Sequence, residues 1–337
     1  MNIKTSIYFF FLAGIALLIS CQNSVSVKKE VSVIFDTDIG PDYDDVGAIA
    51  ILHALADSGE CRILATMASN GHPRIVPILG IMNRYFNRQE LPIGMVRPPV
   101  VNLNAKQHWD SLLVARYPGT LKDNDQAEDA VRLYRKLLAS EPDHSVTIIT
   151  VGFLTNLARL LQSEADEFSR LNGKQLVQGK VKLLVSMAGR FDSAMGEFRE
   201  FNVVRDSVSS KMVFDNWPGP ILFSGFEIGK QIHTGLPIAG NTSIQHSPVK
   251  DVFAWSIPQD PEDRMGRMSW DETAVLVAIR GYEKYFDVKP GKIVGHSDGS
   301  NGWDSTGTRD RYLVFKMPVA ELEEILNTLI MHQPVKH

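Results

Sequence analysis

The stretch DTDIGPDYDD, residues 36–45, holds five carboxylates within ten positions and directly follows the apolar run of residues 31–35. This run predicts a buried strand, and apolar residues on one face of the next segment predict a helix over residues 46–56. Gly40 and Pro41 predict a tight turn between the two elements. Carboxylates gathered inside a fold repel one another unless a cation or water compensates their charge. We therefore expect a cation site here, and an acidic, solvated turn that caps the helix is the alternative.

Strand-like and helix-like patterns alternate along the rest of the chain. We expect strands over residues 62–68, 91–95, 146–151, 181–187 and 220–224, and helices over residues 77–86, 125–140, 271–280 and 318–331. Such alternation predicts the α/β class, with an open, mainly parallel, Rossmann-like sheet covered by helices on both faces in a single large domain. Ligands of such sheets bind beyond the carboxyl ends of the strands. The segment 235–267, rich in Pro, Ser and Gly, is expected to be an inserted loop over that site.

The composition restricts the kinds of ligand. A net charge of −4 without a basic block excludes nucleic acid as the expected partner, since phosphate binding needs clustered Lys and Arg. The oxygen ligands of the acidic stretch, without a nearby Cys or His pair, favour Ca²⁺ or Mg²⁺ over zinc. Cys21 and Cys61 are the two cysteines, so the fold is not a disulfide scaffold.

The N-terminal residues have the pattern of an export signal. The apolar run of residues 7–19 is short for a membrane span and is followed by Ser20 and Cys21, which resembles the lipobox of bacterial lipoproteins. We expect residues 1–20 to be a lipoprotein signal peptide, residues 21–30 a tether acylated at Cys21, and residues 31–337 the folded domain. The protein would then be exported and lipid-anchored to a bacterial membrane, on its periplasmic side or at the cell surface. An ordinary secretory signal or an uncleaved anchor is the alternative.

The acidic stretch closely resembles the signature of the inosine-uridine-type nucleoside hydrolases, which pairs Asp-Thr-Asp with a following Asp-Asp, although its turn is two residues longer here. Four further stretches resemble that family and follow in its order. Residues 68–70 resemble its Ala-Gly-Asn, residues 150–156 its Gly-Pro-Leu-Thr-Asn turn, residues 200–202 reproduce its Glu-Phe-Asn, and residues 270–271 stand where it has a final aspartate at a helix start. The resemblance implies a nucleoside hydrolase-like catalytic domain that cleaves the N-glycosidic bond of a ribonucleoside to free base and ribose. By the same analogy, we expect a homo-oligomer.

The resemblance also implies residue roles around a Ca²⁺ ion. It implies Asp38 as general base and metal ligand, with Asp45, Asp271 and the main-chain carbonyl of Val151 completing the metal ligands. It places ribose hydroxyls on Asp44, Asn70, Glu200 and Asn202, with Asp42 as the competitor of Asp44. A water molecule activated by the ion would attack the sugar while Asp38 accepts its proton.

The sequence departs from the family pattern on the side of the leaving base. Trp270 stands where many members have a histidine that protonates the base. A tryptophan occurs there in the purine-preferring branch, where an indole face would stabilise a protonated purine by stacking. Trp270 therefore indicates either a purine riboside, with a catalytic role for the indole, or another aromatic-lined pocket. His108 and Trp109 lie where the family places another residue that contacts the base, and a purely structural role is the alternative for both.

A second departure concerns the sugar. The family has a Gly-Asn pair shortly before Glu-Phe-Asn, but residues 187–199 contain no asparagine, and Arg190, Glu197 and Arg199 are the candidates to replace it. The remaining polar signals suggest surface roles. We expect a hairpin or rim near residues 298–305, surface positions for His246 and His296, and a solvated helix face with Arg132, Arg135 and Lys136.

Two rival functions remain at the level of sequence. An aspartyl-phosphate hydrolase also places Asp-Thr-Asp after a strand, but it explains neither Glu200 nor Asp271. A non-catalytic surface lipoprotein that binds a nucleoside or sugar through calcium is the other rival, and the two departures from the family pattern favour it.

Overall fold

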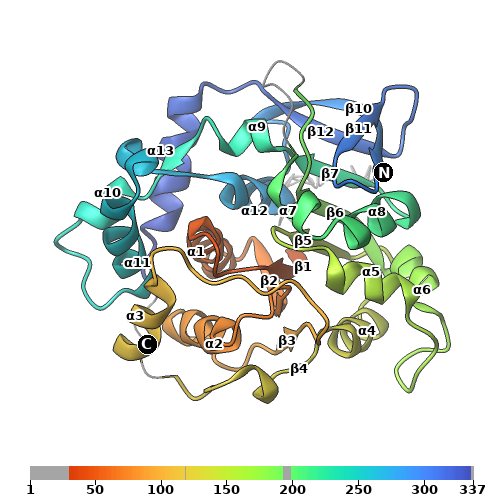
Figure 1. Ribbon diagram of the computed structural model, residues 1–337, viewed down its shortest axis with the longest axis horizontal. Coiled ribbons are helices and arrows are strands. Elements are labelled where there is room, and N and C mark those ends of the chain that lie inside the picture. Colours follow the sequence, from red (N-terminus) through yellow and green to blue (C-terminus); the bar gives the residue numbers. More distant parts are fainter. Residues whose placement is uncertain (1–29, 118, 193–198, 335–337) are drawn as a thin grey trace, which may run out of the picture.

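The structure, a computed structural model, describes residues 30–117, 119–192 and 199–334 (Figure 1). Ten strands form one sheet in the order β11-β10-β12-β7-β6-β5-β1-β2-β3-β4, and β8 pairs with β9 in a separate ribbon. The strands are β1 (Val31–Thr37), β2 (Cys61–Ala68), β3 (Ile93–Met95), β4 (Glu128–Asp129), β5 (Val146–Thr150), β6 (Val181–Met187), β7 (Ile221–Ser224), β8 (His233–Thr234), β9 (Arg267–Met268), β10 (Phe286–Gly295), β11 (Asn301–Asp304) and β12 (Asp310–Phe315).

The sheet is mainly parallel, as the alternation of patterns predicts. From β4 to β12 every neighbouring pair of strands is parallel, while β10 runs antiparallel to both β12 and β11. The turn between β10 and β11 is the hairpin expected near residues 298–305. The α/β class and the open sheet with two covered faces are therefore confirmed.

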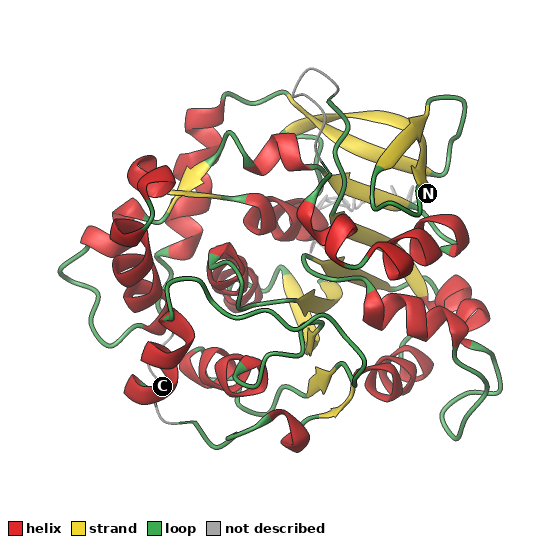
Figure 2. Ribbon diagram, in the orientation of Figure 1, coloured by secondary structure: helices red, strands yellow, loops and turns green. Residues whose placement is uncertain are grey.

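Helices cover both faces of the sheet (Figure 2). The α-helices are α1 (Asp44–Asp57), α2 (Ile75–Tyr85), α3 (Trp109–Arg116), α4 (Ala130–Ser140), α5 (Thr155–Gln162), α6 (Gly173–Lys180), α7 (Phe201–Arg205), α8 (Ser207–Asn216), α9 (Phe226–Gly229), α10 (Leu236–Gly240), α11 (Pro248–Ser256), α12 (Trp270–Arg280) and α13 (Val319–Ile330). The 3-10 turns within the described residues are η1 (Asn124–Gln126), η3 (Ile257–Gln259) and η4 (Pro261–Met265). Helices α1, α2, α11, α12 and α13 lie on one face, and α4, α5, α6 and α8 on the other (Figure 1).

Strand β1 shows how the sequence builds two cores. Val33 and Phe35 point into the core that α1 and α12 cover, whereas Ile34 points into the core that α4 and α5 cover. All three side chains are fully buried, because successive residues of a strand point to opposite faces and both faces carry helices. A nearly continuous apolar run is what such a strand requires, and Ser32 is its one polar member before Asp36.

Two expected elements differ from the structure. The helix expected over residues 125–140 begins at Ala130, because Asp129 caps it by accepting the main-chain N–H of Arg132 at 2.9 Å. The residues before it form η1 and the short edge strand β4. The segment 235–267 is not an irregular loop, since it contains α10, α11, η3 and η4.

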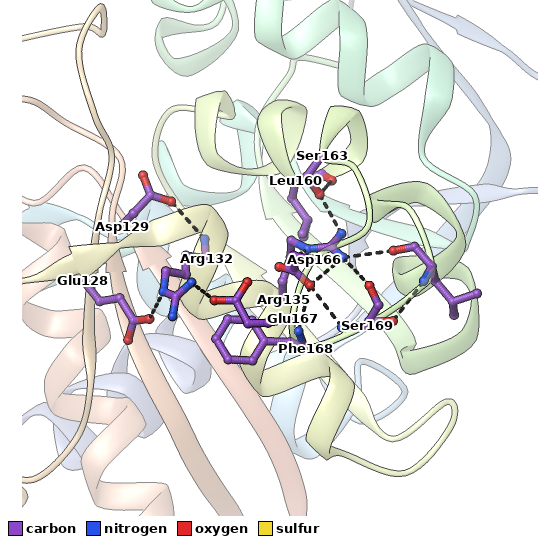
Figure 3. A network of polar contacts seen from close by, with 11 residues as sticks. Glu128, Asp129, Arg132, Arg135, Leu160, Ser163, Asp166, Glu167, Phe168 and Ser169 are labelled. Atoms are coloured by element: carbon purple, nitrogen blue, oxygen red, sulfur yellow. Dashed lines mark hydrogen bonds and ion pairs between the residues drawn. The ribbon is translucent and has the colours of Figure 1, made fainter.

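The helix face with Arg132, Arg135 and Lys136 is only partly solvated, so that expectation is wrong for Arg135. Arg135 is buried and bonds to the carboxylate of Asp166 at 2.6 and 3.0 Å and to the carbonyls of Ser169 and Leu171 at 3.2 and 2.9 Å. Figure 3 shows this guanidinium among its acceptors, beside the exposed pair of Arg132 and Glu167. Arg135 thus ties the connection between α5 and α6 to α4.

The expected signal peptide, the lipid-anchor site and one candidate sugar-binding residue lie outside the described residues. Residues 1–20 and Cys21 lie outside the described residues, and so does Glu197. Within the described ranges, none of the helices combines the length and the apolar character that a membrane crossing requires.

Candidate active site

The site lies where the order of the strands reverses. From β1 the chain proceeds outward through β2 and β3 on one side and through β5, β6 and β7 on the other. After β1 and after β5 the chain therefore leaves the carboxyl edge of the sheet in opposite directions. Open α/β sheets bind ligands at such a point. The loops after β1 and β5 touch there, because a Cβ on Gly152 would lie 2.4 Å from the main-chain nitrogen of Asp38. The second loop can approach Asp38 this closely only with glycine at residue 152.

A pocket opens at this point and extends over about 620 Å³, including space open to solvent. That is within the ordinary range for small-molecule sites. Its lining contains eight of the residues that the sequence places in a site, including Asp42, the competitor of Asp44. The lining residues are Asp38, Pro41, Asp42, Asp44, Lys106, Val151, Met187, Glu200, Phe201, Asn202, Phe226, Trp270 and Asp271.

Three carboxylates meet at the pocket, and two of them, Asp44 and Asp271, line it. One oxygen each of Asp44, Asp45 and Asp271 can be chosen such that all three lie within 4.8 Å of one another, and all three residues are buried. Asp44 also accepts the main-chain N–H groups of Trp270 and Asp271 at 3.2 and 3.4 Å, and Thr37 donates its hydroxyl to Asp45. The N-termini of α1 and α12 thus converge here, and their partial positive charge favours anionic side chains.

The electrostatics of this cluster require further positive charge. Burial, followed by the neighbouring carboxylates, raises the pKa of Asp38, Asp45 and Asp271 well above the usual range of aspartate. Burial also raises the pKa of Asp44 to about 6, despite the nearby guanidinium of Arg267. Carboxylates this crowded become stable as anions when a cation binds between them, and oxygen donors suit Ca²⁺ or Mg²⁺. The residues therefore fit a hard divalent cation.

The expected metal ligands do not all lie in the group of three carboxylates. Asp45 and Asp271 belong to the compact group of three, whose third member is Asp44, whereas Asp38 lines the same pocket outside that group. The carbonyl of Val151 accepts the side-chain N–H of Asn202 at 3.1 Å and has a second lone pair for a cation. The assignment of Asp38, Asp45, Val151 and Asp271 as metal ligands stays a prediction.

Glu200 and Asn202 are held rigidly on the pocket wall. Glu200 caps α7 by accepting the main-chain N–H groups of Asn202 and Val203 at 2.9 and 3.1 Å, and it accepts that of Gly189 at 3.1 Å. Burial raises the pKa of Glu200 to about 7. The side-chain nitrogen of Asn202 donates to the carbonyls of Val151 and Met187 at 3.1 and 3.2 Å, which leaves its side-chain oxygen for a ligand. Arg190 and Arg199, the candidates for the missing asparagine, do not line the pocket.

Two predicted ligand contacts lie away from the pocket lining. Asn70 is fully buried, with its side-chain nitrogen on the carbonyls of Asp38 and Leu103 at 3.2 and 2.9 Å and its oxygen on the N–H groups of His72 and Leu103. These contacts join three loops of the site. His108 is exposed at the start of α3 and Trp109 beside it is fully buried, so neither side chain lines the pocket. Their proposed contacts with substrate remain predictions.

Asp36 belongs to the acidic stretch but not to the cluster of Asp44, Asp45 and Asp271. It accepts the hydroxyl of Tyr134 at 2.9 Å and the side-chain N–H of Asn156 at 3.1 Å, and Asn156 also bonds to the carbonyl of Ala68. Burial raises its pKa to about 7. Asp36 thus links β1 to α4, α5 and β2 below the site.

Arg267 is a residue beside the site that the sequence did not indicate, and Lys106 and Phe226 in the pocket lining are two others. The guanidinium of Arg267 is buried, lies 2.5 Å from Asp42 and 3.6 Å from Asp44, and stacks over the rings of Tyr43 and Trp270 at 5.1 and 5.2 Å. Arg267 lies at the end of the segment that was expected to be a loop. Its spacing from the acidic stretch gives no local signal, although its position three residues before Trp270 could have suggested a place near the pocket.

The profile of the family described as inosine-uridine preferring nucleoside hydrolase matches residues 33–308, which is most of the chain. The chain belongs to this family. The nucleoside hydrolase match includes every motif quoted above, from the acidic stretch to Asp271 and the start of α12. It also accounts for the convergence of these motifs on one pocket.

Individual nucleoside hydrolases resemble the chain more distantly. The pyrimidine-specific ribonucleoside hydrolase RihA of Escherichia coli O81 (strain ED1a) is 30% identical over 205 residues, which cover 58% of this chain and 61% of RihA, less than two thirds of its length. The purine-preferring ribonucleoside hydrolase from Gardnerella vaginalis superposes with a TM-score of 0.70 at 15% identity over 89% of this chain and 98% of its own. The inosine-uridine preferring nucleoside hydrolase from Bacillus anthracis gives a TM-score of 0.66 at 15% identity over 89% and 99%. At such low identity the two structures establish the shared fold alone.

Proposed function

We propose that the protein hydrolyses the N-glycosidic bond of a ribonucleoside to free base and ribose with the help of Ca²⁺. The observation that carries this proposal is the convergence of Asp38, the cluster of Asp44, Asp45 and Asp271, and the rigid Glu200 in one pocket of a nucleoside hydrolase chain. This hydrolysis needs acidic side chains that bind a cation, a further carboxylate that accepts a proton from water, and acceptors that bind the ribose hydroxyls.

Each group has a defined task in the proposed reaction. When bound, Ca²⁺ would lower the pKa of water at the site. Asp38 accepts a proton from water as its oxygen bonds to C1′ of the ribose, and the electron pair of the broken C1′–N bond moves into the base. Asp44, Glu200 and Asn202 hold ribose hydroxyls and so align C1′ with the attacking water. The backbone contacts of Glu200 and Asn202 keep this alignment fixed before substrate arrives.

Two observations favour different bases. The half-buried Trp270 in the pocket lining supports a purine, because a purine offers the larger face for stacking. The name of RihA, a pyrimidine-specific relative at 30% identity, supports a pyrimidine instead. We propose a purine riboside, since Trp270 itself lines the pocket.

The decisive experiment is an assay of base release by the detergent-solubilised full chain. Inosine, adenosine, guanosine, uridine and cytidine are incubated with protein and CaCl₂, with and without a chelator. We expect release that the chelator and Asp38→Ala both abolish, and that Asp287→Ala, an exposed aspartate of β10, leaves intact. If wild-type protein releases no base although it binds calcium, the non-catalytic binding function replaces the enzyme.

The second candidate function is calcium-dependent binding of a nucleoside or sugar without cleavage. It is favoured by Trp270 at the place of the family's histidine and by the lack of an asparagine in residues 187–199. Calorimetric titration of a non-hydrolysing sample with inosine or ribose, with and without calcium, distinguishes a binding protein from an inactive enzyme.

We also propose export and lipid anchoring through Cys21, supported by the apolar run of residues 7–19 and the Ser-Cys pair after it. Metabolic labelling with a palmitate analogue should mark the wild-type chain in a bacterial host but not Cys21→Ala. Cys61, which is buried, serves as the internal control because a lipid could not reach it in the folded chain. Light scattering of the solubilised protein tests the proposed homo-oligomer.

A further inference from the structure

Six lining residues of the pocket that are not members of the carboxylate cluster have few groups that can donate a hydrogen bond. We call the residues Pro41, Asp42, Lys106, Phe201, Phe226 and Trp270 the base-side wall. Proline and phenylalanine side chains have no donor, and the carboxylate of Asp42 faces Arg267 at 2.5 Å. The indole N–H of Trp270 already donates to the carbonyl of Phe226 at 2.8 Å. Among these described residues, Lys106 alone offers side-chain N–H groups to a ligand.

The backbone around Lys106 is held on both sides. Lys106 and Gln107 form the tip of a turn in which the N–H of His108 donates to the carbonyl of Ala105 at 3.3 Å. Before the turn, Leu103 exchanges two hydrogen bonds with the side chain of Asn70, at 3.0 and 2.9 Å. The backbone that carries Lys106 is therefore tied, through Leu103 and Asn70, to the loop that also contacts Asp38.

The far side of the turn is tied to another element. The carbonyl of Gln107 accepts the indole N–H of Trp255, on α11, at 2.8 Å. Ala105 and Gln107 are both buried, while Lys106 between them is exposed and lines the pocket. Within the described part of the chain, its ammonium has neither a hydrogen-bond acceptor nor an ion-pair partner. A charged side chain on a fixed backbone is thus presented to the pocket without a structural task there.

We propose that Lys106 donates a hydrogen bond to the leaving base and so sets both its rate of departure and its binding. This inference rests on the proposed hydrolysis. As water bonds to C1′ and gives its proton to Asp38, the C1′–N bond breaks and its electron pair adds negative charge to the base. Every nucleobase has nitrogen or oxygen acceptors on which this charge collects. The ammonium of Lys106 stabilises them more in the transition state than in the bound substrate.

Lys106 would take the role at the leaving base for which the sequence suggested His108 and Trp270. His108 is exposed outside the pocket lining, and Trp270 has no free donor. A lysine ammonium carries three donors on a flexible stem, so it can follow the acceptor of either a purine or a pyrimidine.

Paired substrates separate this role from a structural one. Inosine and uridine need help for the leaving base, whereas p-nitrophenyl β-D-ribofuranoside releases a stable phenolate and needs far less. We expect Lys106→Met to lower kcat/KM for the preferred nucleoside by about 100-fold and to affect the p-nitrophenyl riboside far less. Lys106→Arg keeps N–H donors and should recover part of the loss. Lys174→Met, an exposed lysine of α6, is the matched control and should change neither value.

The outcomes are distinguishable from failure of the proposed function. If Lys106→Met lowers turnover of both substrate classes equally, or of neither, Lys106 does not assist the leaving base. If wild-type protein cleaves no nucleoside, the proposed function fails and binding decides the inference. Calorimetric titration with hypoxanthine, adenine and uracil should then show weaker binding to Lys106→Met than to Lys174→Met. Equal binding to the two variants would overturn the role of Lys106.

Discussion

The guanidinium of Arg267 lies 2.5 Å from a carboxylate oxygen of Asp42, although the two residues come from distant parts of the chain. The contact joins the acidic turn after β1 to the strand that leads into α12. Asp44 and Asp263 lie within 3.6 Å of the same guanidinium, and both are buried. Arg267 is thus the protein's own counter-charge beside the cluster of Asp44, Asp45 and Asp271.

Removal of that counter-charge should destabilise the fold. We expect Arg267→Met to lower the free energy of unfolding by about 3 kcal/mol, because it leaves buried carboxylates without their partner. Urea denaturation in the presence of a chelator measures the loss. Arg62→Met, which breaks an ion pair with Glu141 at a half-exposed arginine, is the control and should have a much smaller effect. Equal losses in the two variants would show that Arg267 compensates no buried charge.

Calcium should stabilise the protein through the carboxylate cluster. A cation that binds only the folded chain adds about 2.7 kcal/mol to its stability at a concentration 100 times its dissociation constant. We expect CaCl₂ to raise the Tm of the wild-type protein and a chelator to reverse the rise. Asp45→Asn should abolish the shift, and Asp287→Asn should retain it. A full calcium shift in Asp45→Asn would place the ion elsewhere.

Glu200 should make the metal-free protein less stable as pH rises. Burial raises the pKa of its folded form from 4.5 to about 7, so between these values the folded chain binds more protons than the unfolded chain. The free energy of unfolding therefore decreases as pH increases from 4.5 to 7, by on the order of 3 kcal/mol from this group. Denaturation at several pH values in chelator measures this slope. Glu200→Gln cannot titrate and should show a shallower decrease, and an unchanged slope would assign it to other groups.

Gly152 should be intolerant of any side chain. A Cβ there would lie 2.4 Å from the nitrogen of Asp38, so Gly152→Ala must displace the loop after β1. We expect a loss of about 2 kcal/mol in stability and a decrease in kcat/KM for the preferred nucleoside. Gly179→Ala is the matched control, because nothing lies within 4 Å of its added Cβ in α6. It should be neutral or slightly stabilising. A Gly152→Ala protein with normal activity would contradict the close approach of the two loops.

The sequence predicts most of the parallel sheet and the edge of the sheet at which the site is expected. The apolar runs of β1, β5 and β6 identify buried parallel strands because both faces of such strands must be apolar. The motifs at their carboxyl ends identify loops that must meet, because parallel strands end at one edge. The family resemblance assigns Asp38, Asp44, Glu200, Asn202 and Asp271 to one site, and all five line the same pocket of the structure.

The neighbours of the site residues become visible in the folded structure alone. Arg267 faces Asp42, Lys106 lines the wall in place of His108, and Asp36 turns away to Tyr134. None of these contacts has a periodic or local signal, since each depends on how separate elements pack. Periodicity reports the immediate environment of a residue in its own strand or helix. The partner across the fold is set by packing and burial, which is why these three relationships required the structure.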